Sequence, residues 1–192
     1  MIKAIAVISR AAIQRIIRGS QKVTPRWHLI SIHTDRDNEG ARCGPIVTPE
    51  SEPVLKAIGC QSTLSLRFWD ISKLDDEVKE KYPSAILFND DHATQVIDYL
   101  DGLKKEEEDS MLVVHCFAGI SRSGAIGGFA CDYFGMDYLP FAESNPCIMP
   151  NAHISGMLRR VAGMTPSDRK HWDDENGIFI PKFTNTEGGE DA

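Results

Sequence analysis

The clearest chemistry in this sequence lies in one short segment, His115-Cys-Phe-Ala-Gly-Ile-Ser-Arg-Ser123. It follows four apolar residues, Met111–Val114, which predict a buried parallel strand. Helical periodicity then resumes at Ile126. A tight turn between a strand and a helix N-terminus points successive backbone N–H groups into one concavity, which favours an anion. The segment therefore predicts an anion-binding loop.

Three residues of this segment suit phosphate chemistry. Gly119 lets the turn close without a Cβ clash, and Arg122 supplies a planar, permanently charged fork that matches two phosphate oxygens. Cys116 lies at the mouth of the same positive pocket, which favours its thiolate, the nucleophilic form of cysteine. A thiolate that faces an oxyanion cradle is a nucleophile for phosphoryl transfer.

The segment resembles the HCxxGxxRS signature of protein tyrosine phosphatases at every fixed position. Its AGISRS stretch is especially similar to dual-specificity phosphatases, including small bacterial ones. The resemblance implies a phosphocysteine intermediate on Cys116, a thiolate that Ser123 hydrogen-bonds as it leaves, and a supporting role for His115 behind the cysteine. The implied phosphate-binding residues are Phe117, Ala118, Gly119, Ile120, Ser121 and Arg122. No metal or other cofactor is expected.

A general acid is expected upstream, because family members carry an aspartate on a loop after a strand that precedes the cysteine. The segment Thr63–Trp69 alternates apolar and polar residues, which predicts a half-buried strand, and Asp70 follows it. Trp69-Asp70 resembles the tryptophan-containing acid loop of the family, without its proline. The carboxyl ends of parallel strands share one edge of a sheet, so Asp70 is the first candidate for the acid.

Asp70 precedes Cys116 by more residues than is usual in the family, which indicates an insertion at about 71–87. The insertion is either a lid over the site or an exposed loop with no catalytic role. The alternative acids are Asp75 and Asp76 within the insertion and Asp90 and Asp91 at a predicted helix start.

Strands and helices alternate along the rest of the chain. Strands are predicted at 5–8, 27–33, 63–69 and 111–114, and helices after Ser9, at 53–58, after Asn89, from 126 to 134, after Asn151 and from Thr165. This order predicts an α/β fold of the protein tyrosine phosphatase type, with a central, mostly parallel sheet flanked by helices. Residues 1–183 are expected to form one domain and 184–192 a flexible tail. Pro146–Asn151 resembles a P-x-x-PN element before the last core helix of many relatives.

Composition sets further limits. The chain has 192 residues and a formal net charge of −7, which argues against a general nucleic-acid binder. Residues 1–42 are nevertheless basic, so a local basic face can meet an anionic substrate. The apolar run Ala4–Ile8 is too short for a signal peptide or a membrane span. Five cysteines without a CxxC pair indicate neither a disulfide framework nor a zinc site, and a cytoplasmic location is expected.

The expected partners are a phosphorylated protein or peptide as substrate and phosphate- or sulfate-type anions in the site, with no nucleic acid and no membrane. The loop has no lysine, unlike the lipid-phosphatase branch, which argues against a phosphoinositide. Phosphotyrosine is the expected substrate, and phosphoserine and phosphothreonine stay open. Two alternatives remain: a phosphate-binding pseudophosphatase that acts as an interaction module, and a cysteine-loop redox enzyme with Cys131 or Cys147 as the resolving thiol.

Overall fold

The computed structural model describes residues 1–19, 23, 25–34 and 44–164. The helix predicted from Thr165, the domain end at 183 and the tail at 184–192 lie outside these residues.

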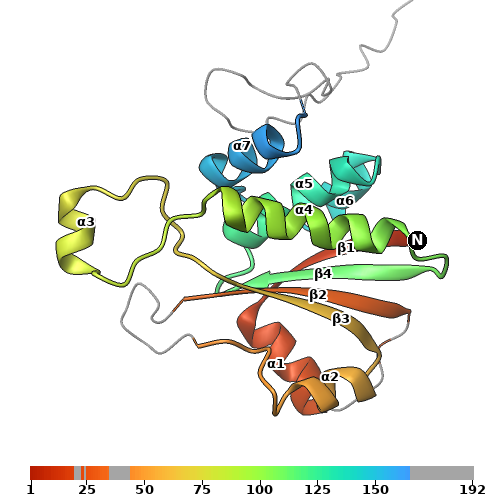
Figure 1. Ribbon diagram of the computed structural model, residues 1–192. Coiled ribbons are helices and arrows are strands. Elements are labelled where there is room, and N and C mark those ends of the chain that lie inside the picture. The colour runs from red at the N-terminus through yellow and green to blue at the C-terminus, as the bar shows by residue number, and fades with distance from the viewer. Residues whose placement is uncertain (20–22, 24, 35–43, 165–192) are drawn as a thin grey trace, which may run out of the picture.

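A parallel sheet forms the centre of the molecule (Figure 1). Its strands are β1 (Ile2–Ser9), β2 (Arg26–His33), β3 (Cys60–Arg67) and β4 (Ser110–Cys116). Their order is β1-β4-β2-β3, and every neighbouring pair is parallel. The predicted α/β class and the central parallel sheet are therefore confirmed. Strand β4 lies inside the sheet, so its carboxyl end emerges between those of β1 and β2.

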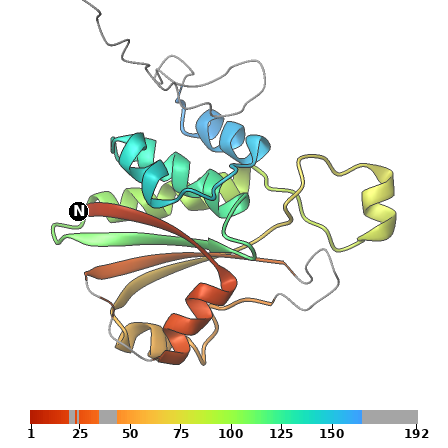
Figure 2. The same cartoon turned by 180° about the vertical axis from the view of Figure 1, so that it is seen from behind.

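Helices cover both faces of the sheet (Figures 1 and 2). On one face lie α1 (Arg10–Gly19) and α2 (Glu52–Ala57), and on the other lie α4 (Asp90–Lys104), α5 (Arg122–Tyr133), α6 (Tyr138–Ser144) and α7 (Ala152–Val161). Adjacent residues of β4 serve the two faces, since Val113 packs in the cluster with α1 and α2 and Val114 packs in the cluster with α4, α5 and α7. This burial on both sides is the reason for the continuous apolar run.

The three caps that the sequence predicts within the described residues are in place, at Ser9, Asn89 and Asn151. The Ala12 N–H donates to Ser9 Oγ at 3.2 Å, the His92 N–H to Asn89 Oδ1 at 3.0 Å and the Ile154 N–H to Asn151 Oδ1 at 3.2 Å. Helix α6, which begins after the cap Asp137, is an element that the sequence pattern did not indicate.

The third strand differs from its predicted range. It begins at Cys60 and ends at Arg67, rather than running from Thr63 to Trp69. The Trp69 N–H donates to the Ile86 carbonyl at 2.8 Å, outside the sheet, so the chain has left β3 before it reaches Asp70.

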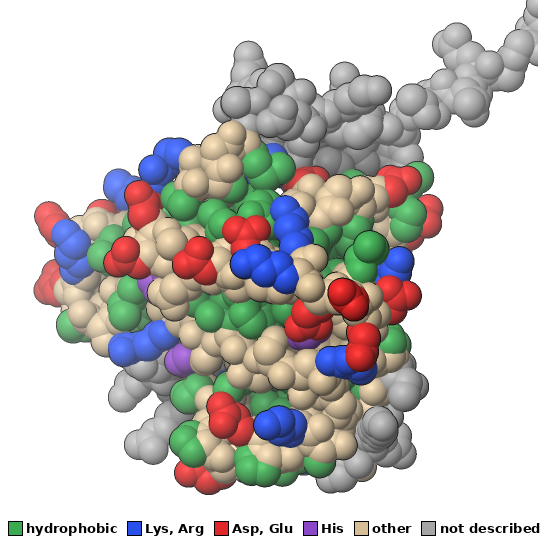
Figure 3. All heavy atoms as spheres, turned by 45° about the vertical axis from the view of Figure 1, so that its right-hand side comes forward, with side chains coloured by type: hydrophobic (Ala, Val, Ile, Leu, Met, Phe, Trp, Pro, Cys, Tyr) green, Lys and Arg blue, Asp and Glu red, His purple; other side chains and the backbone are tan. Residues whose placement is uncertain are grey.

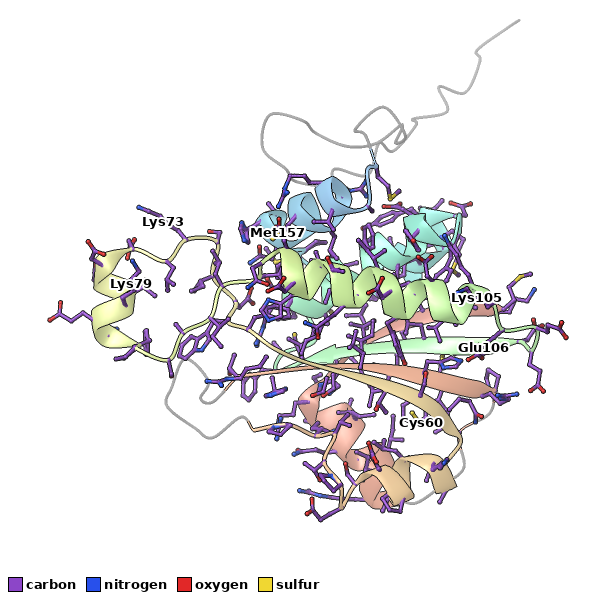
Figure 4. All side chains as sticks on the ribbon, in the orientation of Figure 1. Cys60, Lys73, Lys79, Lys105, Glu106 and Met157 are labelled. Carbon is purple, nitrogen blue, oxygen red and sulfur yellow. The ribbon has the colours of Figure 1, made fainter. Side chains whose placement is uncertain are left out.

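Residues 71–87 form an excursion that carries α3 (Asp76–Lys81) and extends away from the sheet (Figure 1). The Trp69 and Tyr82 rings pack with their centroids 4.8 Å apart. This contact joins Trp69, which lies just before the excursion, to Tyr82, the residue that follows α3. Figure 4 shows Lys73 and Lys79 on this excursion. Glu106 lies at the other end of the strands, just before β4 begins.

One face of the molecule carries side chains of both charges, with hydrophobic side chains between them (Figure 3). Figure 3 shows acidic and basic side chains interspersed over one face. None of the helices within the described residues is long and apolar enough to cross a membrane.

Candidate active site

The turn from β4 into α5, residues 116–122, is called the phosphate loop below, after the role that the sequence predicts for it. Gly119 sits in it at φ +76°, and a Cβ at this position would lie 2.5 Å from the backbone C of Ile8 and N of Ser9. A side chain is therefore excluded by both the backbone conformation and the space. The Arg10 N–H donates to the Phe117 carbonyl at 3.0 Å, so the end of β1 holds the loop from its other side.

The Cys116 thiol lies at the base of this loop and is 2% exposed as a residue. Its Sγ accepts a hydrogen bond from the Gly119 N–H at 3.3 Å and lies 3.1 Å from Ser123 Oγ. Both contacts suit a thiolate, because an amide and a hydroxyl can each donate to it. The structure thus brings Ser123 to Cys116, as the resemblance implies, and adds the Gly119 N–H as a donor that the sequence did not predict.

Arg122 begins α5 and is buried. One guanidinium nitrogen, Nη1, donates to the Phe68 carbonyl at 3.1 Å and fixes the side chain. The buried Nε makes no hydrogen bond within the described residues and lies 3.9 Å from Asp70 Oδ2. An anion at the loop would satisfy this donor.

Asp70 faces the phosphate loop, although it follows the end of β3 by three residues. Its Oδ1 accepts hydrogen bonds from Ser121 Oγ at 2.8 Å and from Asn151 Nδ2 at 3.0 Å. The side chain keeps 31% of its surface exposed, so it can reach both the loop and solvent. This is the position that a proton donor to a leaving group at the loop requires.

The other candidate acids make different contacts. Asp75 caps α3 by accepting from the Val78 N–H at 3.0 Å, Asp76 lies 3.5 Å from Lys79 Nζ, Asp90 pairs with Arg160, and Asp91 lies in the first turn of α4. Of the five predicted aspartates, Asp70 is the one whose described contacts include the phosphate loop.

His115 is fully buried behind the loop. Its Nε2 lies 2.8 Å from Ser31 Oγ, and its Nδ1 lies 3.4 Å from the Cys116 carbonyl oxygen. Burial lowers the pKa of His115 to about 4, and the nearby charges of Arg10 and Arg122 act in the same direction. The ring is therefore neutral near pH 7 and braces the strand that carries the cysteine.

The segment Pro146–Asn151 supports the loop from outside. The Met149 N–H donates to the Ile120 carbonyl at 3.2 Å, and the Asn151 N–H donates to the Ser121 carbonyl at 3.3 Å. Sequence reasoning identified Asn151 as a helix cap and missed its contact with Asp70. The signal in the sequence was the resemblance of Pro146–Asn151, which has three residues between its two prolines, to an element that precedes the last core helix of many relatives.

The cysteines proposed for a redox role occupy different environments. Cys131 lies inside α5 in the core, where burial raises the pKa of its thiol to about 11, and Cys147 is exposed. Both are free thiols. Among the described residues, no group of three or more His, Cys, Asp or Glu side chains is placed to hold a metal ion.

No protein-family model matches this chain, and no curated protein sequence matches it. Among solved structures, it is similar to a human tyrosine phosphatase-like serine/threonine/tyrosine-interacting protein, with 19% sequence identity and a TM-score of 0.44. The match covers 81% of this chain and 85% of that chain. This likeness is weak in sequence and in structure, so the case for the site rests on its own residues.

Proposed function

We propose that the protein is a phosphatase that hydrolyses phosphotyrosine through a phosphocysteine intermediate on Cys116. One observation carries the proposal: the Cys116 thiol, with its Gly119 and Ser123 donors, lies in the same loop as a buried Arg122 whose Nε lacks a hydrogen-bond partner within the described residues. A nucleophile and a preorganised oxyanion cradle are together what phosphoryl transfer needs.

In the first step the Cys116 thiolate attacks phosphorus in line, and an S–P bond forms as the P–O bond to the phenol oxygen breaks. The loop N–H groups and Arg122 hold the three equatorial oxygens, which keep the charge in the transition state. Asp70, protonated, gives its proton to the leaving phenolate oxygen. A neutral phenol then departs, and Asp70 is left as a carboxylate.

In the second step the Asp70 carboxylate takes a proton from a water molecule that attacks phosphorus. The S–P bond breaks, inorganic phosphate forms, and the electron pair returns to Cys116 as a thiolate. Ser123 donates a hydrogen bond to that thiolate, which makes it a better leaving group. The cycle needs no metal, because side chains and loop amides supply the nucleophile, the acid and the charge stabilisation.

A further feature of the loop favours phosphotyrosine. Phe117 follows the nucleophile directly and is 46% exposed, so the loop offers an aromatic face to the substrate. A phenyl leaving group gains from packing on such a ring. The loop carries no lysine for further phosphates of an inositol ring. Assays with phosphoserine and phosphothreonine peptides test whether the enzyme also hydrolyses these two residues.

The test is hydrolysis of para-nitrophenyl phosphate with EDTA present, for the wild type and Cys116→Ser. We expect turnover by the wild type and none by the variant, because a serine hydroxyl is a far weaker nucleophile at neutral pH. Mass spectrometry after acid quench should detect the phosphoryl group on Cys116. A matched control is Cys131→Ser, which removes a buried thiol outside the site and should retain turnover if it folds.

A folded wild type that is inert toward this ester and toward phosphopeptides contradicts the proposal. Phosphopeptide binding without turnover would instead identify a phosphate-binding module. Reduction chemistry that depends on Cys147 would identify a redox enzyme.

A further inference from the structure

Two large apolar side chains lie exposed at the phosphate loop. Within the described part of the chain, the well-exposed large hydrophobic side chains are those of Met1, Phe117, Leu139 and Met149. Phe117 belongs to the loop, and Met149, which is 74% exposed, lies in the segment Pro146–Asn151 that supports the loop from outside. A single exposed apolar side chain is ordinary, whereas a group of them beside a site indicates a surface that meets a ligand.

The backbone of Met149 is fixed against the loop, although its side chain is exposed. The Met149 N–H donates to the Ile120 carbonyl at 3.2 Å. Ile148, directly before it, packs against the core, and Asn151, two residues after it, donates to Asp70 at 3.0 Å. The Met149 side chain is therefore carried at a set position close to the loop and to the proposed acid, with most of its surface open to solvent.

The two segments that meet here are uncharged. Residues 117–121 and 145–151 contain no charged side chain. Two further apolar residues of the loop are exposed or half-buried. The surface that these side chains form together, the apolar rim, consists of Phe117, Ala118, Ile120 and Met149. This rim offers a substrate apolar contact and no ion pair, whereas the positive charge of the site lies deeper, on the buried Arg122.

Phe117 and Met149 meet different parts of a substrate. Phe117 directly follows the nucleophile, so the phenyl ring of a phosphotyrosine is its partner in the proposed reaction. Met149 joins the loop at Ile120, four residues after the nucleophile, and is left for a part of the substrate beyond that ring. A methionine side chain is unbranched and flexible, so it adapts to apolar partners of different shape. Packing against it removes apolar surface of both partners from water, which is favourable.

We propose that Met149 determines substrate specificity by packing against a large apolar side chain close to the phosphotyrosine of a peptide. The inference rests on the proposed function and deepens it, because it names the substrate class as phosphotyrosine peptides with a leucine, methionine or phenylalanine nearby. The contact forms with the peptide and not with the phosphoryl group, so it acts on the choice of substrate and leaves the chemistry at Cys116 as described.

The test measures kcat/KM for pairs of phosphotyrosine peptides that carry leucine or glutamine at one position. That position is moved from two residues before the phosphotyrosine to two residues after it. The wild type should prefer leucine by about tenfold at one or more positions, as expected for burial of part of a side chain. Met149→Gln should abolish this preference, and Met149→Leu should retain it. The ratio within a pair is the readout, because general damage to the fold would lower kcat/KM for both peptides alike.

The matched control is Leu139→Gln, which also replaces an exposed apolar side chain. Leu139 is 55% exposed and lies on α6, which follows the end of α5 that is far from the loop. This variant should retain the leucine preference. High salt should also leave the preference of the wild type in place, since salt screens charges and not apolar contacts.

The outcomes separate this inference from the proposed function. Turnover of para-nitrophenyl phosphate together with equal kcat/KM within every peptide pair overturns the role of Met149 and leaves the phosphatase intact. A leucine preference that persists in Met149→Gln, or that is lost equally in Leu139→Gln, also overturns it. A wild type that hydrolyses no phosphate ester removes both proposals.

Discussion

The Ser121 hydroxyl donates a hydrogen bond to the Asp70 carboxylate at 2.8 Å, across 51 positions of sequence. Asn151 Nδ2 donates to the same oxygen, Oδ1, at 3.0 Å. Two donors thus hold one carboxylate oxygen, while Oδ2 lies 3.9 Å from Arg122 Nε. This orientation turns the carboxyl group toward the phosphate loop, and it is the geometric basis for our proposal that Asp70 is the general acid.

Asp70→Asn should slow hydrolysis according to the leaving group. Phenyl phosphate releases a basic phenolate and needs a proton, so we expect its kcat to fall by about 10²-fold or more. Para-nitrophenolate leaves more easily, so its kcat should fall less. Steady-state kinetics with both esters measures the difference. Asp76→Asn, on the exposed α3, is the control and should match the wild type. Near-normal turnover of phenyl phosphate by Asp70→Asn would place the acid elsewhere.

The parts of the site that the sequence predicted are those that local geometry controls. Cys116, Gly119, Arg122 and Ser123 lie within one turn between a strand and a helix, so their spacing alone brings them together. Asp70 needed an additional argument, that parallel strands end at one edge. The contacts of residues from distant segments could not be predicted from the sequence. Tertiary packing alone brings Arg10 and Asn151 to the loop.

Gly119→Ala should damage the site through the backbone. A Cβ here would meet the backbone of Ile8 and Ser9 at 2.5 Å, in a conformation with φ +76° that L side chains rarely adopt. We expect a loss of at least about 2 kcal/mol in the free energy of unfolding, together with loss of activity as the loop moves. Urea denaturation and phosphatase assays measure the two effects.

The control for that substitution is Gly156→Ala, within α7, where an added Cβ meets nothing within 4 Å. Alanine has the higher helix propensity, so this variant should gain up to about 1 kcal/mol and retain activity. Equal stability for the two variants would mean that the close approach of the loop to β1 does not exist in solution.

The fold was predictable where a sequence pattern strongly favoured one kind of element. Val113 and Val114, in a short apolar run, favour a strand buried on both faces, and Asn89 before a helical repeat favours a cap, and the structure confirms both. The end of β3 was not predictable, because the alternation continues to Phe68 while the Trp69 N–H has turned to Ile86. Helix α6 spans seven residues, too few for a clear periodicity.

Asn145→Ala should destabilise the fold at the outer edge of β1. Asn145 Oδ1 accepts from the Val7 N–H at 2.7 Å, and its Nδ2 donates to the carbonyls of Ile5 at 3.1 Å and Phe141 at 2.8 Å. The side chain thus takes the place of a neighbouring strand. Its removal leaves buried backbone groups without partners, and we expect a loss of about 2–3 kcal/mol by urea denaturation. A loss below about 0.5 kcal/mol would mean that water replaces these bonds.

His115 should make stability depend on pH. Burial lowers the pKa of His115 to about 4 in the folded protein, whereas an unfolded chain binds this proton near pH 6.5. Between these two values the unfolded state holds more protons, so the free energy of unfolding falls as the pH falls. The total loss from this group is about 3 kcal/mol between pH 6.5 and 4. Above pH 6.5 the contribution is constant.

The pH effect of His115 can be separated from that of the other histidines by substitution. Burial also lowers the pKa values of His28 and His92, so the wild-type slope includes their contributions. His115→Asn removes one titrating group while keeping a polar side chain that can face Ser31 Oγ. Urea denaturation from pH 4.5 to 7 should give a shallower slope for this variant, by up to about 1.4 kcal/mol per pH unit. Parallel slopes for the two proteins would contradict a buried, neutral His115 beneath the phosphate loop.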